Sequence, residues 1–469
     1  MPAVEKFLST WITSQRWYAG KGRAPRWNRI GGFTLPDPSG AANIRVELLL
    51  DTAKDPVLYQ VPLTERVVPL PDAGVALIAT LETPEGLRYL YDGPRDPAGA
   101  AALLRLLLDE RAILPSDGSP GFAARGHRVP TTPALRIVSS RVLAGEQSNT
   151  SIIYELETPD GVPAAPIIFK VFRSIHHGEN PDVVLPGALA AAGSTAVPTP
   201  IGHTIGQWPD SGQGSGFAHG HLAFAQEFLP GVEDAWRVAV RAAEAGIDFA
   251  QQAKSLGIAT AEVHRTLASV LPTHPASSHD IAAVMASMRA RFEQACAQVP
   301  AVARHRDAIQ SVHSRAETGA WPPMQRVHGD YHLGQVLAVP GRGWVILDFE
   351  GEPLRPMIER TGEDSPLRDV AGMLRSLDYV AGAVTRGTPD AAAAVIAREW
   401  VRAARNALLE GYRAHANYHL DDFWPLLTAF EIDKAVYEAI YEARNRPDWL
   451  EIPVAAIDRL VAPLNGQTH

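Results

Sequence analysis

The amino-acid sequence predicts an α+β protein with a strand-rich lobe followed by a helical lobe. In several runs between residues 41 and 230, apolar residues recur with a period of two, as they do in strands. From residue 232 onward, Ala, Glu, Arg and Gln recur at helical spacing instead. With 469 residues, the chain is also too long for one ordinary core. We therefore expect two lobes with a cleft between them, where ligand sites commonly lie.

The first part of the chain, residues 1–92, is predicted to be a strand-rich subdomain. The runs NIRVELLLD, PVLYQVPLTE, GVALIATLE and LRYLYDG alternate apolar and polar residues and are separated by Gly, Pro and Asp, which indicates an antiparallel meander over residues 41–92. The preceding MPAVEKFLSTWITSQRWYAGKGR is typical of a short amphipathic helix and lacks the apolar core of a secretory signal.

Residues 93–230 are predicted to form a second strand-rich subdomain. A helix is expected at 97–114, followed by strands in ALRIVSSRVL, TSIIYELET and AAPIIFKVFR, of which the last two form a hairpin. NPDVVLPGALAAAG is then typical of a helix, although Pro186 disfavours helix at Leu185. A final strand is expected in GHLAFAQEFLPG.

The remainder, residues 231–469, is predicted to be helical around one polar loop. Long helices are expected at 366–383, 389–415 and 421–446. The loop is QRVHGDYHLGQVL, and it precedes GWVILDFEGEP. Candidate catalytic and ligand residues gather in these two segments, so we expect the functional site there.

Two interpretations of the polar loop compete. His328 and His332 are four residues apart, as in zinc-binding helices, but Gly329 and Gly334 disfavour a helix there. Alternatively, Asp330 takes the proton of a hydroxyl group while later residues hold Mg²⁺. The second interpretation matches the protein-kinase spacing of catalytic Asp, Asn and Asp-Phe-Gly, with these residues in the metal-binding positions: Gln335, Asp348 and Glu350.

A candidate phosphate-binding group lies upstream of the loop. Lys170 is in the middle of the apolar strand PIIFKVF, where an unpaired ammonium is costly, so it pairs either with a structural acid or with a phosphate. The segment AGEQSNTS before the hairpin is predicted to be a turn that brings small polar groups within reach of a phosphate: Ser148, Asn149, Thr150 and Ser151.

Composition narrows the possible partners. The formal net charge of −9 argues against nucleic acid as the main partner. No run of ~18 apolar residues is present, so no membrane span is predicted. The single cysteine, Cys296, leaves no internal disulfide and favours a reducing cytoplasm.

Together these motifs resemble those of actinobacterial maltokinases, a branch of the aminoglycoside-phosphotransferase-like kinases. The resemblance runs nearly end to end, through RWYAGKGR, GEQSNTS, KVFR, NPD, QRVHGDYHLGQVL, ILDFEGEP, SPLRDVAGMLRS and DKAVYEAIYEARNRPDWLEIP. It implies a bilobal eukaryotic-protein-kinase-like fold with an N-terminal cap subdomain. It also implies ATP- and Mg²⁺-dependent phosphorylation of maltose at its anomeric hydroxyl, giving maltose 1-phosphate for α-glucan synthesis from trehalose. A cytoplasmic monomer or weak homodimer is expected, with a trehalose-isomerising enzyme as a possible partner.

The resemblance assigns roles to individual residues. Asp330 would be the catalytic aspartate, and Gln335, Asp348 and Glu350 would hold the metal ion. Lys170 and the polar turn would contact the nucleotide phosphates, and AQEFL at 225–229 would hydrogen-bond adenine through Gln226 and Phe228. Asp369 of PLRDVAGMLRS would tie down the catalytic loop, and His328 would brace it.

The last long helix is the candidate sugar site. Tyr437, Tyr441 and Arg444 lie on one stripe near Trp449, where aromatic faces with hydroxyl rims suit a sugar ring. The alternative is a surface helix with one ion pair between Lys434 and Glu438, worth a few tenths of a kcal/mol. The resemblance adds three residues to the predicted sugar contacts: His332, Arg375 and Lys434.

One departure from the family pattern leaves alternatives open. Relatives carry Glu at the position of Val184 to pair with the strand lysine, so Lys170 must find another acid, Asp182 or Glu179. An amino-sugar kinase of the same fold, with extra carboxylates for its ammonium group, is the second functional hypothesis. An inactive protein that only binds nucleotide or sugar is the third.

Overall fold

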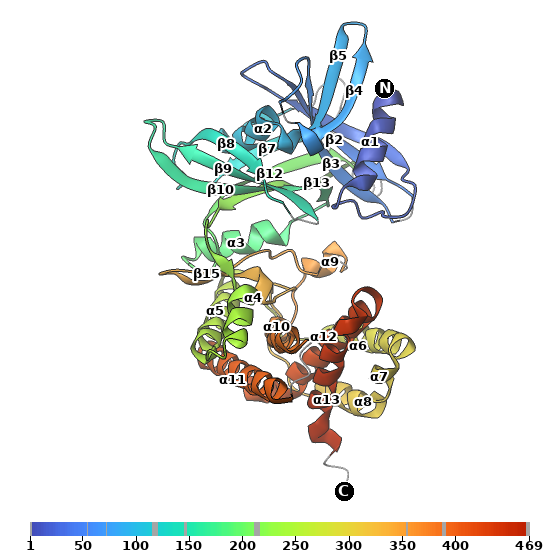
Figure 1. Cartoon of the computed structure of the whole chain (residues 1–469), viewed down its shortest axis with the longest axis vertical. Coiled ribbons are helices and arrows are strands. Elements are labelled where there is room, and N and C mark those ends of the chain that lie inside the picture. The colour runs from blue at the N-terminus through green and yellow to red at the C-terminus, as the bar shows by residue number, and fades with distance from the viewer. Residues whose placement is uncertain are drawn as a thin grey trace. The chain divides into compact units, whose positions relative to one another are not determined.

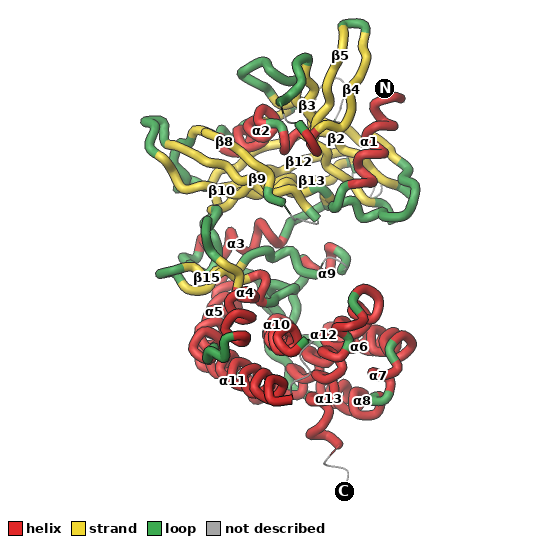
Figure 2. The backbone as a smooth tube through the Cα atoms, in the orientation of Figure 1, coloured by secondary structure: helices red, strands yellow, loops and turns green. Residues whose placement is uncertain are grey.

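The computed structural model describes residues 2–53, 55–71, 73–114, 121–144, 148–210, 216–352, 355–386 and 391–465. It divides into two compact units (Figures 1 and 2). The strand unit comprises Met1–Val184 and Pro198–Pro230, and the helical unit comprises Leu185–Val197 and Gly231–His469. The predicted α+β fold, with strands first and helices last, is confirmed. Within the described residues, no helix combines the length and the apolar character needed to cross a lipid bilayer.

The first sheet of the strand unit is the predicted meander with two additions. Its order is β1-β2-β3-β5-β4, with β11 paired to β3. The strands are β1 (Trp27–Leu35), β2 (Asn43–Asp51), β3 (Val57–Arg66), β4 (Leu77–Thr83), β5 (Gly86–Asp92) and β11 (Ser174–Ile175). The expected helix is α1 (Pro2–Ser14). The segment after it contributes Tyr18 to an aromatic cluster, in which the ring centroids of Tyr18 and Tyr59 are 5.6 Å apart.

The second sheet carries the predicted hairpin. Its order is β6-β7-β12-β13-β10-β9-β8, and β9 (Asn149–Glu157) pairs antiparallel with β10 (Pro163–Phe172). The other strands are β6 (Ala112–Ile113), β7 (Ala123–Arg128), β8 (Arg136–Val142), β12 (Pro200–Pro209) and β13 (Phe217–Glu227). Helix α2 (Pro97–Leu108) ends earlier than predicted, because the chain turns into β6.

A buried arginine joins the two sheets. The strand β10 that carries Lys170 leads through Arg173 into β11, which belongs to the first sheet. The side chain of Arg173 is fully buried, with Nη2 2.7 Å from Asp92 and Nε donating to the hydroxyl of Thr150 at 2.8 Å. Because this ion pair is desolvated, loss of one partner would leave a buried charge uncompensated. The first sheet thus anchors the end of the lysine-bearing strand.

Helix α3 (Pro181–Ala191) corrects the expectation at Leu185. The helix continues through Pro186, which lacks the N–H that would bond one turn back. Leu185 and Leu189 are fully buried, and their burial offsets the lost hydrogen bond. Tertiary packing therefore overrides the local preference of the residue before proline.

The helical unit surrounds one continuous apolar core. Its helices are α4 (Ala235–Glu244), α5 (Ala250–Val270), α6 (Ser278–Gln298), α7 (Pro300–Ala303), α8 (Arg306–Thr318), α9 (Met357–Arg360), α10 (Leu367–Thr385), α11 (Ala391–His415), α12 (Trp424–Asn445) and α13 (Glu451–Asn465). A small sheet has the order β14-β15-β16, in which β15 (Val336–Val339) and β16 (Gly343–Ile346) come directly after the polar loop and β14 (Glu233–Asp234) comes before α4. The three long helices predicted near the C-terminus correspond to α10, α11 and α12.

Candidate active site

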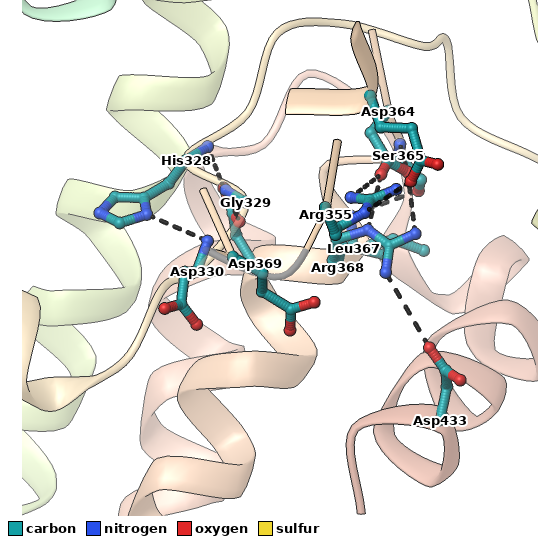
Figure 3. Close-up of polar contacts among 12 residues, drawn as sticks. His328, Gly329, Asp330, Arg355, Asp364, Ser365, Leu367, Arg368, Asp369 and Asp433 are labelled. Carbon is teal, nitrogen blue, oxygen red and sulfur yellow. Dashed lines mark hydrogen bonds and ion pairs between the residues drawn. The ribbon is translucent and has the colours of Figure 1, made fainter. Parts of the chain in front are cut away.

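The polar loop is held by one buried aspartate of α10. Asp369 is 1% exposed and accepts the backbone N–H of His328 at 2.8 Å and of Gly329 at 2.9 Å. Its carboxylate also lies 3.0 Å from Nε2 of His264 (Figure 3 shows the loop beside Asp369). Burial alone would raise the pKa of Asp369, but His264 and the loop amides outweigh it and lower the pKa. Asp369 therefore ties down the loop, as predicted.

His328 braces the loop from the other side. Its Nε2 lies 2.8 Å from the carbonyl oxygen of Leu347, and the backbone N–H of Asp330 donates to its Nδ1 at 3.3 Å. The ring also packs against Phe349, with centroids 4.7 Å apart. With both nitrogens and its face in use, His328 positions Asp330 and is not a reactive group, which agrees with the prediction.

Asp330 lies in a pocket beside a lysine of α12. Lys434 Nζ is 3.3 Å from Asp330 Oδ1 and 2.6 Å from Glu352 Oε1. Burial alone would lower the pKa of Lys434, but the two carboxylates raise it well above its usual range. Burial likewise opposes ionisation of Glu352, yet Lys434 lowers the pKa of Glu352 to about 2. Lys434 and Glu352 therefore both carry their charges at neutral pH.

The pocket wall is built by helices that are far apart in sequence. Arg291 comes from α6, Arg368 and Gly372 from α10, and Asp433 from α12. Gly372 allows α10 to approach the loop, because a Cβ there would lie 2.6 Å from the carbonyl oxygen of Tyr331. Arg291, Arg368 and Asp433 are pocket residues that were not predicted from the sequence. Asp433 could have been suggested only by its position next to Lys434, a predicted sugar contact. No motif near Arg291 or Arg368 points to a place in the pocket.

The predicted metal ligands Gln335 and Asp348 lie side by side. The side-chain amide of Gln335 donates to Asp348 Oδ2 at 3.2 Å, and a carboxylate oxygen of Glu350 lies within 4.8 Å of one of Asp348. Gln335 ends the short helix η3 (Leu333–Gln335), whose last carbonyl accepts from the N–H of Leu347 at 2.8 Å. Asp348 and Glu350 offer carboxylate oxygens, and Gln335 offers its amide oxygen once its amide group is rotated by 180°. Oxygen ligands of this kind fit Mg²⁺.

The backbone of Asp348 is strained. Its φ is 60°, in the left-handed region that disfavours most residues with a side chain. Strain of this kind persists where surrounding contacts hold it, and it concentrates at functional sites. The β15–β16 hairpin supplies that constraint, since Val336 pairs with Ile346 just before the turn to Asp348.

On the strand unit, Lys170 pairs with Asp182. The distance from Lys170 Nζ to Asp182 Oδ2 is 2.8 Å, and Asp182 is 5% exposed. Asp182 was one of the two acids predicted to replace the glutamate that relatives carry at the position of Val184. The acid that pairs with Lys170 is therefore Asp182, in the first turn of α3, two positions before the glutamate position of the relatives at Val184.

The polar segment before the hairpin is shorter as a turn than expected, because β9 already begins at Asn149. Asn149, Thr150 and Ser151 are buried on β9 and do not form a turn, and the hydroxyl of Thr150 is bonded to Arg173. Ser148 alone among the four is exposed and outside the strand, and residues 145–147 lie outside the described residues. The connection between the antiparallel strands β8 and β9 therefore spans residues 143–148, and the phosphate contacts assigned to this segment stay predictions.

The segment AQEFL is likewise part of the sheet. Gln226 lies on β13 between Ile168 and Pro200 of the neighbouring strands. The backbone N–H of Phe228 donates to the carbonyl oxygen of Pro166 at 3.0 Å, so it is not open to adenine. The N–H of Phe228 is therefore used within the strand unit, and the adenine contact of the remaining AQEFL backbone stays a prediction.

Of the seven predicted sugar contacts, Lys434 is the one that lines the Asp330 pocket. The ring of Tyr437 follows one turn later, 5.2 Å from Lys434 Nζ. His332 Nδ1 accepts the N–H of Gly334 at 3.1 Å, and burial lowers the pKa of His332, so the ring is neutral and caps η3. The surface-pair alternative is also wrong, because Lys434 pairs with Asp330 and Glu352.

The remaining sugar candidates lie elsewhere. Tyr441 is 44% exposed, and Arg444 bonds Gln298 at 2.9 Å. Trp449, on the short helix η5 (Pro447–Trp449), stacks on Tyr379 with ring centroids 6.2 Å apart. These residues sit at or beyond the C-terminal end of α12, about 10 Å or more along the helix from Lys434 by its 1.5 Å rise. Their sugar role stays a prediction.

Arg375 is a structural residue, which corrects its assignment to the sugar site. It is fully buried, with Nη2 2.6 Å from Glu438, and it also pairs with Asp378. The carboxylate of Asp378 also pairs with two other arginines: its Oδ2 lies 3.3 Å from Nη1 of Arg405, and its Oδ1 lies 2.7 Å from Nη1 of Arg459. A guanidinium enclosed by carboxylates has no free edge for a sugar hydroxyl. Arg375 was misassigned because it belongs to a family motif, and a motif does not show that one of its residues forms a buried ion pair.

An Asp378→Asn variant should be strongly destabilised. Burial opposes ionisation of Asp378, but Arg405 and Arg375 lower its pKa to about 2. Since the folded pKa is depressed, the stabilisation is present above the unfolded pKa of about 4 and is lost as pH falls toward 2. We expect a loss of about 3–5 kcal/mol at pH 7 by urea unfolding, shrinking below pH 4.

The control is Asp421→Asn, which removes an exposed partner of Arg413 at 2.7 Å. That change should cost less than about 1 kcal/mol. Equal losses for both variants, or a loss for Asp378→Asn that does not change between pH 7 and pH 3, would contradict the buried network.

Comparison with known proteins agrees with this geometry. Residues 11–96 match the maltokinase N-terminal cap domain, and residues 185–419 match the phosphotransferase enzyme family. A glucosamine kinase of Streptacidiphilus jiangxiensis is 31% identical over 467 residues, covering 93% of this chain and 98% of the relative. A glucosamine kinase of Mycolicibacterium smegmatis is 28% identical over 336 residues, covering 68% and 79%.

A solved structure shares the fold. The glucosamine kinase in complex with glucosamine, ADP and inorganic phosphate superimposes with a TM-score of 0.65 and 23% identity, covering 96% of this chain and 98% of the other. The family match spans half of the chain, and it includes the loop, the metal-site residues and all of α10. The chain therefore belongs to the phosphotransferase enzyme family, in the maltokinase-like group of kinases that carry an N-terminal cap domain.

Proposed function

We propose that the protein transfers the γ-phosphoryl group of ATP to the anomeric hydroxyl of maltose, giving maltose 1-phosphate and ADP. The observation that supports a neutral sugar is the charge balance of the Asp330 pocket. Three acids line it, Asp330, Glu352 and Asp433, together with three bases, Arg291, Arg368 and Lys434. An uncharged sugar enters such a pocket without a net charge cost, whereas an ammonium group would find no excess of carboxylates to offset the cost of removing it from water.

Asp330 is proposed to accept the proton of the attacking hydroxyl. Lys434 engages Oδ1 of Asp330, so we assign Oδ2 to the substrate. The sugar oxygen forms a bond to the γ-phosphorus, the bond from that phosphorus to the β,γ-bridging oxygen breaks, and the proton passes to Asp330. Because such a reaction depends on positioning, the hold of Asp369 and His328 on the loop is central to the mechanism.

The metal-site and nucleotide residues have supporting roles in the proposal. Gln335, Asp348 and Glu350 would hold Mg²⁺, which supplies positive charge to the phosphate oxygens when bound. Lys170, released from or shared with Asp182, would contact the nucleotide phosphates. A trehalose-isomerising partner, a cytoplasmic location and a monomeric or weakly dimeric state stay predictions from the family.

An amino-sugar kinase is the second candidate, because the two relatives described above are named glucosamine kinases. The two candidates separate in a single experiment. The kcat/KM of ADP release is measured with maltose and with glucosamine at saturating ATP and Mg²⁺. We expect the value for maltose to be at least 10-fold higher. A higher value for glucosamine would replace the proposed substrate, and the absence of sugar-dependent ADP release would refute both.

A further inference from the structure

We propose that His221 is a positioning residue for nucleotide binding, which holds the start of α3 and thereby fixes Asp182 and the ammonium group of Lys170. This inference rests on the proposed function, because it takes Lys170 to contact the nucleotide phosphates. It goes further by assigning to a histidine of β13 a role that is exerted only through other residues.

The first observation is the way in which α3 begins. Asn180 is the N-cap residue, since its Oδ1 accepts the N–H of Asp182 at 2.9 Å. In a capping box, the side chain of the third helical residue bonds the backbone N–H of the N-cap, but here that residue is Val183, whose side chain has no acceptor. Instead, the N–H of Asn180 donates to Nδ1 of His221 at 3.0 Å. His221 therefore supplies the missing half of the cap from β13.

The second observation is that the ring of His221 is neutral. A backbone N–H can only donate, so Nδ1 is unprotonated and the ring proton lies on Nε2. Burial, followed by the neighbouring His203 and His127, lowers the pKa of His221 to about 4. The ring centroids of His203 and His221 are 5.1 Å apart, and His127 stacks on His203 at the same distance. A row of three imidazoles disfavours charge on each of its members, so the acceptor is available at neutral pH.

The third observation is the short path from this cap to Lys170. Asp182 lies in the first turn of α3, and its Oδ2 pairs with Lys170 Nζ at 2.8 Å. An aspartate side chain has one methylene and one torsion angle fewer than a glutamate, so it can compensate less for a shift of the helix start. Lys170 itself lies opposite Phe224 of β13, the strand that also carries His221. The strand β13 therefore constrains both partners of the ion pair.

The segment that leads into α3 is anchored to β13 as well. Gly178 forms a bridge with Gly220, and its N–H donates to the carbonyl oxygen of His219 at 2.8 Å. The chain therefore runs beside β13 up to the bond from Asn180 to His221. Loss of the acceptor at position 221 would leave the N–H of Asn180 without this partner and allow the start of α3 to shift, together with Asp182.

The first test compares two replacements of His221 by their KM for ATP. His221→Leu has no acceptor in its side chain, whereas His221→Asn places Oδ1 close to the position of Nδ1. We expect the KM for ATP to rise roughly 5- to 10-fold in His221→Leu, as for one lost hydrogen bond, and to stay within a factor of about two in His221→Asn. The KM for the sugar should stay the same in both variants. The matched control is His219→Leu, the same change two residues earlier on β13, which should leave both KM values unchanged.

A double-mutant cycle tests whether His221 acts through the lysine, which a purely structural role would not require. Lys170→Ala alone should raise the KM for ATP roughly 10-fold or more, and adding His221→Leu to it should have little further effect. If Lys170→Ala raises this KM while a folded His221→Leu does not, or if the two effects simply multiply, the inference is overturned and the role of Lys170 stands. If Lys170→Ala leaves the KM for ATP unchanged, the nucleotide part of the proposed function fails, and this inference with it.

Nitrogen-15 NMR of the histidine-labelled wild-type enzyme tests the contact itself, and it decides the matter should His221→Leu fold poorly. The signals of His221, assigned by their absence in His221→Asn, should show a neutral ring protonated at Nε2 at pH 7. A ring that carries its proton on Nδ1, or on both nitrogens, cannot accept the N–H of Asn180 and overturns the inference.

Discussion

Replacing Asp330 with asparagine is expected to lower kcat by roughly 10²- to 10⁴-fold, the usual contribution of a positioned general base. The amide has nearly the same shape and can keep its contact with the loop, but it cannot accept the hydroxyl proton. Lys434 retains its bond to Glu352 at 2.6 Å, so the pocket should stay assembled. Steady-state ADP release with maltose measures the effect, and thermal unfolding checks that the variant is folded.

The control for this change is Asp307→Asn, in the first turn of α8, which does not line the pocket. It should leave kcat within a factor of about two. A folded Asp330→Asn variant that retains more than a tenth of the wild-type kcat would remove Asp330 from the catalytic role. The phosphoryl transfer would then depend on positioning and electrostatic stabilisation without a carboxylate base.

Replacing Asp348 with asparagine is expected to lower kcat at least roughly 100-fold at a fixed Mg²⁺ concentration, because charge stabilisation in phosphoryl transfer depends on the metal. Asparagine tolerates the left-handed backbone at φ 60°, so the hairpin should be preserved, whereas alanine would add strain. The half-maximal Mg²⁺ concentration should also rise at least 10-fold, as a charged ligand becomes neutral.

A titration of activity against Mg²⁺ measures both effects. The control is Glu359→Gln, which removes an acid of α9 bonded to Arg355 at 3.1 Å. An unchanged Mg²⁺ dependence in Asp348→Asn would show that the ion is held elsewhere. If Glu359→Gln raised the half-maximal Mg²⁺ concentration as much as Asp348→Asn, the effect would come from the loss of any negative charge in this region and not from the loss of a metal ligand.

The larger elements of the fold were predictable because their periodicity is local. Period-two runs predicted the strands, and helical spacing predicted α10, α11 and α12. Strand β1 was missed because Gly31 and Gly32 interrupt its pattern. Gly32 is needed for close packing, since a Cβ there would lie 2.4 Å from the carbonyl oxygen of Val46. A helix at Leu185 was not expected, because the residue before a proline disfavours helix. That local preference does not include the stabilisation from burying Leu185 and Leu189.

The site was predictable where its residues are close in sequence. Asp330, Gln335 and Asp348 fall within one loop and the following hairpin, so their spacing carries the geometry. The pocket wall was not predictable in this way, because Arg291 and Asp433 are 142 residues apart and meet only through the packing of α6 on α12. Arg375 was misassigned for the related reason that a motif does not distinguish a buried ion pair from a ligand contact.

The account depends on Asp330 and its pocket directing a phosphoryl group onto the anomeric oxygen of a neutral disaccharide. The most direct measurement is ³¹P and ¹³C NMR of the product formed from ATP, Mg²⁺ and ¹³C-labelled maltose by the wild-type enzyme. The account predicts one phosphate signal coupled to the anomeric carbon of maltose. A phosphate coupled to any other carbon, or maltose left unmodified while glucosamine is phosphorylated, would contradict it.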